Sequence, residues 1–372
     1  MSPARLVDIL ASVPDPRVAR TRVHKLVDIL VIALLAVING ADGWEEMTAF
    51  ATVREGWLRG FLDLTGGVPC PDTFRRVFEA MDVKAFSQCL AEVTAEITGD
   101  LQGKVVAIDG KTLRRSFDRR SGKSPLHMVS AWVAERGITL GQIATEEKSN
   151  EISAIPALLK SIDIKGATIT LDAMGCQKAI AAEIVNSGAD YALALKDNHP
   201  TLREEVETVF AKAEAEDLQV CEVESTGHGR HELRTVTIST QVDELTDASA
   251  WKGLQSIVRV ERQRTVGEKT STETAYYLSS LLVDARTMES RIRAHWSIEN
   301  SLHWTLDMVF HEDSSRIRHR AGASNLSQMR KLALSLLKLE QSRPGNSIAR
   351  KRKIAGWEPD YAFRILSTIS RK

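Results

Sequence analysis

The chain has 372 residues, more than one ordinary core accommodates, so two or three domains are expected. Hydrophobic residues make up 43% and charged residues 26% of the sequence, a composition typical of soluble globular proteins. The four cysteines have no CxxC spacing, which argues against zinc fingers and a disulfide framework and favours a reducing, cytoplasmic location. The longest apolar run, residues 29–38, covers about half of a membrane span, and no signal peptide is visible, so no membrane association is expected.

Charge is unevenly distributed along the chain, although the net charge is zero. Residues 316–372 contain 14 Lys and Arg against 3 Asp and Glu, whereas residues 201–250 contain 12 acids against 4 bases. A basic C-terminal end on a neutral protein indicates a polyanionic partner. A solvated basic tail explains the charge pattern equally well.

The first 100 residues are predicted to be helical. An apolar helix is expected over residues 23–39, ending at Gly40, and a later helix runs to Ala80 with Asp72 and Thr73 as candidate N-caps. Five basic side chains near the start of the apolar helix could contact phosphates, although a solvated helix start is slightly favoured. They are Arg17, Arg20, Arg22, His24 and Lys25.

After residue 104 the pattern changes from helical to strand-like. Strands are predicted at 105–109, 127–134, 138–145, 168–172 and 191–195, and helices at 152–162, 177–186 and 201–215. The resulting order, β-β-β-α-β-α-β-α, is that of the RNase H-like fold, in which the first and fourth strands are adjacent. The expected fold class is therefore mixed α/β (α+β) with an RNase H-like core.

A β-rich insertion is predicted to interrupt this core, because four strand-like runs occupy residues 219–280. Helical periodicity returns at 287–310 and at 330–339, and the polar, basic chain from Gly345 onward is expected to be loosely ordered. The predicted divisions are a helical N-terminal domain (1–100), the first part of the core (101–217), the insertion subdomain (218–284), the second part of the core (285–342) and a basic C-terminal tail (343–372).

Two carboxylates stand at predicted strand ends, Asp109 after residues 105–108 and Asp172 after residues 168–171. On neighbouring strands the two acids would repel each other and attract a hard divalent cation. With Glu299 they would form a two-metal site for phosphoryl transfer, in which Mg²⁺ binds the attacking and leaving oxygens. Each Asp alone is better explained as a turn former near a glycine. Both together, at these strands, favour the metal site.

Glu299 belongs to a helical series in which His295, Glu299, His303 and Asp307 recur every four residues and share one flank. The two histidines raise the alternative of a zinc site. That alternative is weak, because an HExxH motif is absent and histidines on helices are more often surface or capping groups.

Two tryptophans in the same segment also have two interpretations. Trp296 and Trp304 could stack on nucleic-acid bases. With Ile292 and Met308 they recur at intervals of four and eight, which fits a core-facing stripe better.

Basic residues close to the acids are candidates for phosphate contacts. Lys111, Arg114 and Arg115 follow the first Asp and could neutralise a phosphate backbone, with solvated loop charges as a slightly poorer explanation. His228 and Arg230 lie in a predicted hairpin of the insertion, where a simple turn is an equally good explanation.

Three motifs carry a family resemblance: Ala-Ile-Asp-Gly-Lys at 107–111, Asp-Ala-Met-Gly-Cys-Gln at 172–177 and His-Trp-Ser-Ile-Glu-Asn at 295–300. Together they resemble the ISAs-type insertion-sequence transposases, DDE-class enzymes that include the H-repeat-associated proteins of bacteria. Supporting blocks lie in family order, and the similarity runs to about Lys338. These blocks are residues 15–17, 71–74, 149–152, 195–198, 228–230 and 302–307.

The resemblance implies an RNase H-like core, a β-rich insertion between the second Asp and the Glu, and an N-terminal domain associated with DNA binding. It implies that Asp109, Asp172 and Glu299 are catalytic ligands of two Mg²⁺ ions, for which Mn²⁺ can substitute. The implied reaction is strand cleavage and transfer at insertion-sequence ends. The implied partners are double-stranded DNA of the element ends and the target, and a second copy in a synaptic homodimer.

The DNA-binding residues expected from the motifs and their neighbours form a longer set. They are Lys111, Arg114, Arg115, Lys196, Asn198, His228, Arg230, Arg293, His295, Asn300 and His303. The broader group often surrounds its Glu with a Tyr, an Arg and a later Lys, where this chain has Ile292, His295 and Leu306. Two alternatives stay open: a catalytically silent DNA-binding remnant, and a nuclease of the same fold that performs no strand transfer.

Overall fold

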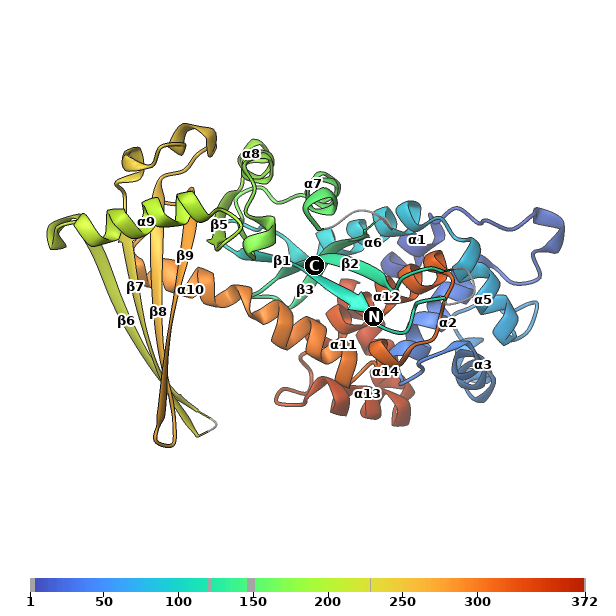
Figure 1. Ribbon diagram of the computed structural model, residues 1–372. Coiled ribbons are helices and arrows are strands. Elements are labelled where there is room, and N and C mark those ends of the chain that lie inside the picture. The colour runs from blue at the N-terminus through green and yellow to red at the C-terminus, as the bar shows by residue number, and fades with distance from the viewer. Residues whose placement is uncertain (1–3, 119–121, 146–150, 228, 371–372) are drawn as a thin grey trace. The chain divides into compact units, whose positions relative to one another are not determined.

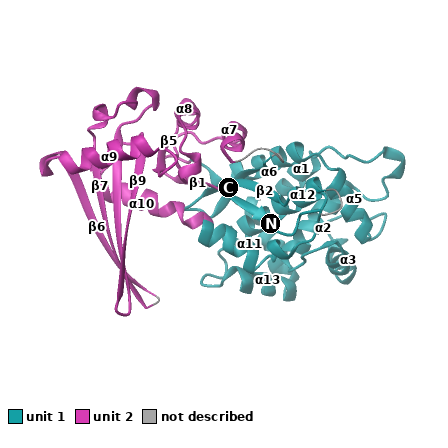
Figure 2. Ribbon diagram, in the orientation of Figure 1, with its two compact units in different colours: residues 1–100, 110–149, 299–372 teal, residues 101–109, 150–298 magenta. Residues whose placement is uncertain are grey.

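The computed structural model describes residues 4–118, 122–145, 151–227 and 229–370. The chain divides into two compact units (Figure 2). Unit 1 contains residues 1–100, 110–149 and 299–372, and unit 2 contains residues 101–109 and 150–298. Within the described ranges, every helix falls short of the length or the apolarity that crossing a bilayer requires.

The first 100 residues, all in unit 1, are helical as predicted. The helices are α1 (Ala4–Ala11), α2 (Leu26–Ile38), α3 (Trp44–Val53), α4 (Glu55–Leu58), α5 (Pro71–Ala80) and α6 (Val83–Thr98). Helix α2 is apolar on nearly all sides, and all of its residues except Val27 are buried. Helix α5 begins at Pro71, whose missing N–H costs nothing in a first turn, so its N-cap is Cys70 and not the predicted Asp72 or Thr73.

The rest of unit 1 is a β-hairpin and a set of C-terminal helices. Strands β2 (Leu126–Val133) and β3 (Ile138–Ala144) pair antiparallel, and the helices are α11 (Trp304–Met308), α12 (Arg320–Leu339), α13 (Ile348–Trp357) and α14 (Pro359–Leu366). Helix α12 is central, because every residue from Gly322 to Leu337 is buried and the helix contacts α2, α5, α6 and β3. The helix predicted at 330–339 is therefore confirmed, with an earlier start.

The C-terminal residues form helices α13 and α14, which corrects the expectation of a loosely ordered chain from Gly345 onward. Two of the basic side chains there are buried and bond backbone carbonyls. The Lys351 Nζ donates to the Leu337 carbonyl at 2.8 Å, and the Arg352 Nη2 donates to the Val37 carbonyl at 2.9 Å. Sequence charge was misleading because these cations satisfy helix ends and do not face solvent.

Unit 2 is built on a mixed sheet with helices beside it. Its strands are the first part of β1 (Val105–Leu113), β4 (Thr168–Leu171), β5 (Asp190–Leu195), β6 (Leu218–Gly227), β7 (Arg230–Ser239), β8 (Ser256–Val266) and β9 (Lys269–Ser279). Its helices are α7 (Glu151–Ser161), α8 (Lys178–Asn186), α9 (Pro200–Lys212) and α10 (Ala285–His295). The pairs β1–β4 and β4–β5 are parallel, and the remaining pairs of this unit are antiparallel.

Strand β1 begins in unit 2 and ends in unit 1. Its neighbours give the order β3-β2-β1 in unit 1 and β1-β4-β5-β9-β8-β7-β6 in unit 2. The core strands thus follow the order β3-β2-β1-β4-β5 with β1 and β4 adjacent, which confirms the predicted RNase H-like fold class. The strands predicted at 219–280 are formed, and they extend the sheet beyond β5 through β9.

In unit 2, α10 packs against β6 and β7, and its Met288 and Ile292 share a core cluster with Val236, Ile238 and Val258. Figure 1 shows β6–β9 continuing past α9 and α10 to their hairpin tips. Short helices complete the description: η1 (Ala19–Thr21), η2 (Ala173–Gly175), η3 (Ala215–Asp217), η4 (Val242–Glu244), η5 (Ala248–Ala250), η7 (Glu312–Ser314) and η8 (Ser367–Ser370) are 3₁₀, and η6 (Ile298–His303) is a π-helix.

Candidate active site

Unit 2 brings Asp109 and Asp172 to the same edge of the sheet. Strands β1 and β4 are parallel neighbours in register, with Ile108 opposite Leu171. Asp109 is the next residue of β1, which continues to Leu113, so the predicted strand end at Asp109 is wrong, whereas Asp172 directly follows the last residue of β4. Adjacent strands lie about 4.8 Å apart, so the two acids are neighbours where β4 ends. The predicted adjacency of the two strands is therefore confirmed. The pair occupies the sheet edge where ligands of α/β proteins characteristically bind.

The local sequence explains why the two carboxylates face outward. Residues 105–108 are buried, whereas Asp109 is half-buried and Asp172 is exposed. Asp172 is the N-cap of η2, and its Oδ1 accepts a hydrogen bond from the Gly175 N–H at 3.2 Å. A Cβ on Gly175 would lie 3.0 Å from the Leu171 side chain, so a larger residue in the turn that holds Asp172 would require Leu171 to shift.

Helix α10 is hydrogen-bonded to β4, the strand that precedes Asp172. The Arg291 guanidinium donates to Thr168, and one helical turn later the Nδ1 of His295 hydrogen-bonds the Thr170 hydroxyl at 3.0 Å. Burial lowers the pKa of His295, although the nearby Asp172 acts in the opposite direction. His295 is therefore neutral near pH 7. Its described contact favours a structural role over the predicted contact with phosphate.

Glu299 lies in unit 1 at the start of a π-helix. The helix predicted over 287–310 is interrupted, because α10 ends at His295 and residues Ile298–His303 form η6. Such segments are rare and often mark functional sites. Glu299 is exposed there. Because Glu299 belongs to unit 1 and the two aspartates to unit 2, convergence of the three acids stays a prediction.

The donor chemistry of the aspartate pair fits a hard divalent cation. Mg²⁺ is typically bound through one or two carboxylates, water and substrate phosphates, which is what two carboxylates at an open sheet edge can supply. Across the part of the chain that the structure describes, no three His, Cys, Asp or Glu side chains form a ready metal cluster. Asp109 and Asp172 are therefore the residues of unit 2 that would hold Mg²⁺.

A second acidic group, in unit 1, surrounds Lys111 and contains three carboxylates; we call it the Lys111 cluster. The Lys111 Nζ lies 2.7 Å from Asp307, 2.9 Å from Asp313 and 3.4 Å from Glu312. Burial opposes the charge of Lys111, but the carboxylates outweigh burial, and the pKa of Lys111 lies above its ordinary value. This geometry favours a structural role for Lys111, as the counter-ion of these three carboxylates, over the predicted phosphate contact. Sequence gave no signal for the cluster, since Lys111 and Asp313 are 202 positions apart.

His303 is half-buried beside this cluster. Burial, assisted by the positive charges of Lys331 and Lys111, lowers its pKa to about 3. The imidazole is therefore neutral near pH 7 and adds no positive charge that would attract a phosphate.

Two tryptophans correct the sequence interpretation. Trp296, Trp304 and Met308 have exposed fractions of 46%, 58% and 59%, whereas Ile292 is buried. The predicted core-facing stripe is therefore wrong beyond Ile292. For Trp304 and Met308 the physical reason is the π-helix that precedes them, which holds more residues per turn than an α-helix and so breaks the four-residue repeat. Trp296 lies before it, at the C-cap of α10.

The other predicted DNA-binding residues are mostly exposed. Arg114 lies 3.2 Å from Asp313, Asn198 donates to the Ala173 carbonyl at 2.7 Å, and Arg293 lies 3.9 Å from Glu289. The remaining exposed residues of the set are Arg115, Lys196, Arg230 and Asn300. His228 lies outside the described residues.

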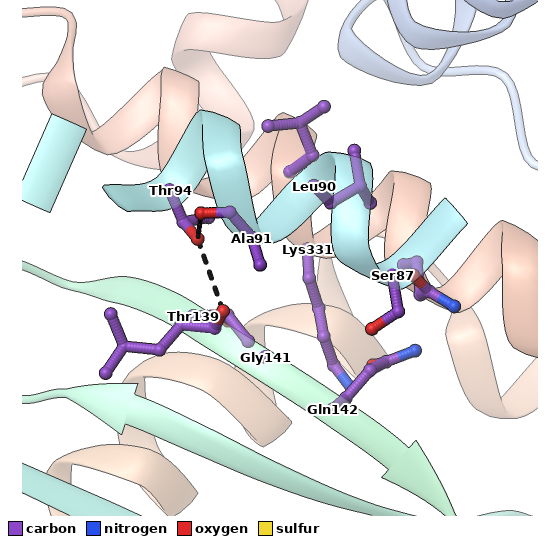
Figure 3. Close-up of a pocket in the computed structure, with 11 residues that line it drawn as sticks. Ser87, Leu90, Ala91, Thr94, Thr139, Gly141, Gln142 and Lys331 are labelled. Atoms are coloured by element: carbon purple, nitrogen blue, oxygen red, sulfur yellow. Dashed lines mark hydrogen bonds between the residues drawn. The ribbon is translucent and has the colours of Figure 1, made fainter. Parts of the chain in front are cut away.

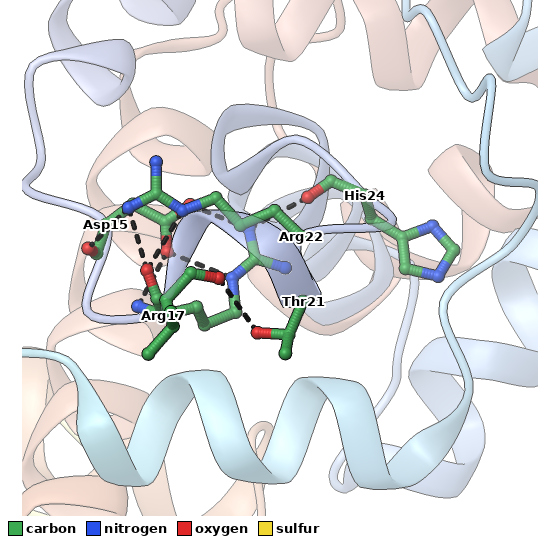
Figure 4. A network of polar contacts seen from close by, with 6 residues as sticks. Asp15, Arg17, Thr21, Arg22 and His24 are labelled. Atoms are coloured by element: carbon green, nitrogen blue, oxygen red, sulfur yellow. Dashed lines mark hydrogen bonds and ion pairs between the residues drawn. The ribbon is translucent and has the colours of Figure 1, made fainter.

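The basic N-terminal segment is largely bonded within itself (Figure 4). The Arg17 Nη2 donates to Asp15 at 2.9 Å and to the His24 carbonyl at 2.8 Å, and Arg22 donates to the Arg17 carbonyl. Lys25 pairs with Asp63 at 2.5 Å. These contacts favour a structural role for Arg17 and Arg22, which differs from both sequence interpretations, phosphate contact and a solvated helix start.

A buried lysine beside a small cavity is also structural (Figure 3). The cavity, of about 30 Å³, is lined by residues of α6, β3 and α12. The Lys331 Nζ donates to the Ser130 hydroxyl at 2.8 Å and to the Gln142 side chain, and burial lowers its pKa to about 8. Lys331 thus joins α12 to the β2–β3 hairpin.

Comparison with known proteins adds the family. The family model "Transposase DDE domain" matches residues 100–336, which include Asp109, Asp172 and Glu299, and "DDE_Tnp_1-associated" matches residues 7–93. "Putative transposase YncI" of Escherichia coli O157:H7 is 40% identical over 100% of this chain and 96% of its own length. "H repeat-associated putative transposase YhhI" of E. coli K12 is 35% identical over 98% of each chain. "Uncharacterized protein in dhlA 3'region" of Xanthobacter autotrophicus is 40% identical over 73% of this chain and 93% of its own. The chain therefore belongs to the DDE transposase family.

Proposed function

We propose that this protein is a DNA transposase that cleaves DNA at insertion-sequence ends and joins the freed strand to target DNA in a Mg²⁺-dependent reaction. The observation that carries the proposal is the placement of Asp109 and Asp172 on adjacent parallel strands, within the segment that the transposase family model matches. The full-length similarity to proteins named as transposases supports it.

In the proposed reaction Asp109, Asp172 and Glu299 would hold two Mg²⁺ ions. The chemistry that the bound ions supply is activation of the attacking hydroxyl and neutralisation of charge on the scissile phosphodiester. The chain contributes position. Strand β1 fixes Asp109, the η2 turn fixes Asp172, and the π-helix presents Glu299 to solvent. Positioning and electrostatics then suffice, without a covalent enzyme intermediate.

The partners follow from the same proposal. The substrates are duplex element ends and target DNA in the bacterial cytoplasm. Strand transfer requires two ends held together, so a homodimer is proposed for the synaptic complex. Arg115, Lys196 and Asn300 are exposed, and we propose, as from the sequence, that they bind the DNA backbone.

The test uses the full chain, labelled duplexes carrying the element ends, an unlabelled target and Mg²⁺. The wild type is expected to give both nicked ends and joined products. Asp109→Asn, Asp172→Asn and Glu299→Gln should abolish both while binding DNA normally, and the exposed Asp243→Asn should react like wild type. Binding without cleavage by the wild type would indicate a silent remnant, and cleavage without joining would indicate a nuclease. A fully active Glu299→Gln would remove that residue from the site.

A further inference from the structure

The outer halves of β6–β9 form a sheet whose two faces differ in charge. The pairing register places Arg230 opposite Val266, Arg234 opposite Arg262, and Val266 opposite Lys269. Residues directly opposite in antiparallel strands, and alternate residues along a strand, point to the same face. One face therefore carries five basic residues against two acids, Glu232 and Glu273; we call it the basic face. Its cations are Arg230, Arg234, Arg262, Arg264 and Lys269.

The basic face is the outward continuation of the surface on which α10 lies. By the same alternation along the strands, Val236 and Val258 lie on this face, where they pack with Met288 of α10. Arg234, the next residue outward on β7, pairs with Glu289 of α10 at 3.2 Å. Beyond this pair the strands continue past the helix to their tips (Figure 1).

The opposite face has an excess of acids. It carries Glu222, Glu224 and Glu261 against Arg259 and a histidine, His231, and its polar residues toward the tip are mostly threonines. Helix α9 lies on this side, where Phe210 contacts the Tyr276 ring and the Arg259 guanidinium. The sheet therefore separates positive from negative charge across its thickness.

Three cations of the basic face are exposed and available. Among the described residues, Arg230, Arg264 and Lys269 form no ion pair, whereas Arg262 pairs with Glu273 and Arg234 pairs with Glu232. Val266, which lies between them in the register, is 47% exposed. A row of unneutralised cations across the neighbouring strands β7, β8 and β9 is complementary to an extended polyanion.

We propose that the basic face binds the phosphate backbone of duplex DNA, with Arg230, Arg264 and Lys269 as the contacting residues. The inference rests on the proposed function for the choice of DNA as the polyanion. Its contacts go to phosphates and so position the duplex without reading its sequence. The insertion is thereby assigned a DNA-positioning role separate from the acidic sheet edge.

The test compares two triple variants with the same change in charge. Arg230→Gln/Arg264→Gln/Lys269→Gln removes three positive charges from the basic face. Thr226→Glu/Gln263→Glu/Thr270→Glu adds three negative charges at exposed positions of β6, β8 and β9, on the opposite face. Fluorescence anisotropy measures binding of a labelled element-end duplex from about 50 to 200 mM salt. Circular dichroism confirms that both variants are folded.

The basic-face variant should bind roughly ten-fold more weakly or worse, and the slope of log affinity against log salt should fall by about 3, one per lost phosphate contact. The opposite-face variant should keep the wild-type slope. Equal weakening of both variants would show only a net-charge effect, and wild-type binding by the basic-face variant would show that the face serves another partner; either result overturns the inference. If either of these results is obtained while the wild type cleaves DNA, the inference about the basic face fails but the proposed function survives. If the wild type fails to bind or cleave DNA, the proposed function itself fails.

Discussion

Two groups of carboxylates in this protein show how burial and counter-charge assign different roles to the same residue type. Asp172 is exposed at a sheet edge, next to Asp109 on the neighbouring strand, and its Oδ1 accepts a backbone N–H. Asp313 and Glu312 lie in the Lys111 cluster, where a buried ammonium faces them. A buried ammonium among carboxylates holds structure together, whereas two neighbouring carboxylates, one half-buried and one exposed, invite a cation.

The largest expected effect is a loss of catalytic activity without a loss of stability when Asp172 is changed. Asp172→Asn should lower the cleavage rate by about 10³-fold or more, equivalent to about 4 kcal/mol of barrier, because a metal ligand is lost. Its free energy of unfolding should change by less than about 0.5 kcal/mol, since the residue is exposed. Cleavage assays and urea denaturation on one preparation measure both quantities. A destabilised Asp172→Asn would mean that the residue is structural.

Lys111→Met should show the reverse pattern. Removing the ammonium takes the facing cation from the buried Glu312 and the half-buried Asp307, and the free energy of unfolding should fall by about 3 kcal/mol. Urea denaturation near pH 7 checks the prediction. Lys111→Met/Glu312→Gln should recover part of the loss, because the second change removes an unpaired charge. A single variant as stable as wild type would contradict the structural role of Lys111.

The third effect is a pH dependence from His303. Its pKa is lowered to about 3 in the folded state, by burial and then by Lys331 and Lys111, against about 6.5 when unfolded. Between these values the unfolded state binds more protons, so acidification destabilises the folded chain. At pH 5 the wild type should have lost on the order of 1–2 kcal/mol relative to pH 8, and His303→Gln should lose less. Parallel pH profiles of the two proteins would disprove the shift.

The smallest effect concerns the turn that holds Asp172. Gly175→Ala forces a Cβ to within 3.0 Å of the Leu171 side chain, which should cost about 1 kcal/mol of stability. It should also move Asp172 and slow cleavage several-fold. Gly56→Ala, where a Cβ meets nothing within 4 Å, is the matched control. Cleavage by Gly175→Ala at the wild-type rate would show that the turn tolerates the side chain.

The adjacency of the first and fourth strands was predicted from the order of the elements, which matches the RNase H-like fold. The core strands themselves were predicted from local pattern, since apolar runs that end in polar residues mark strands, although β1 continues past Asp109 to Leu113. The strands of the insertion were predicted for the same reason. Their continuation of the core sheet through β5 and β9 was not, since pairing between distant strands leaves no local signature.

Other features could not be predicted, for physical reasons that differ. The exposure of Trp304 follows from a π-helix, which a four-residue repeat cannot reveal. The order of α13 depends on Lys351 and Arg352, whose charges are satisfied by distant carbonyls. The basic face could be identified only from the pairing register of β7, β8 and β9, which determines which charged residues lie on the same face of the sheet. In each case the missing information is tertiary.

Metal binding by the aspartate pair is the most direct test of this account. Titration of the full chain with Mn²⁺, followed by electron paramagnetic resonance of the free ion, measures it without requiring activity. The account predicts that Asp109→Asn and Asp172→Asn each weaken Mn²⁺ binding by at least about ten-fold, while Asp243→Asn binds as wild type does. Wild-type affinity in Asp172→Asn would contradict the assignment of the metal site.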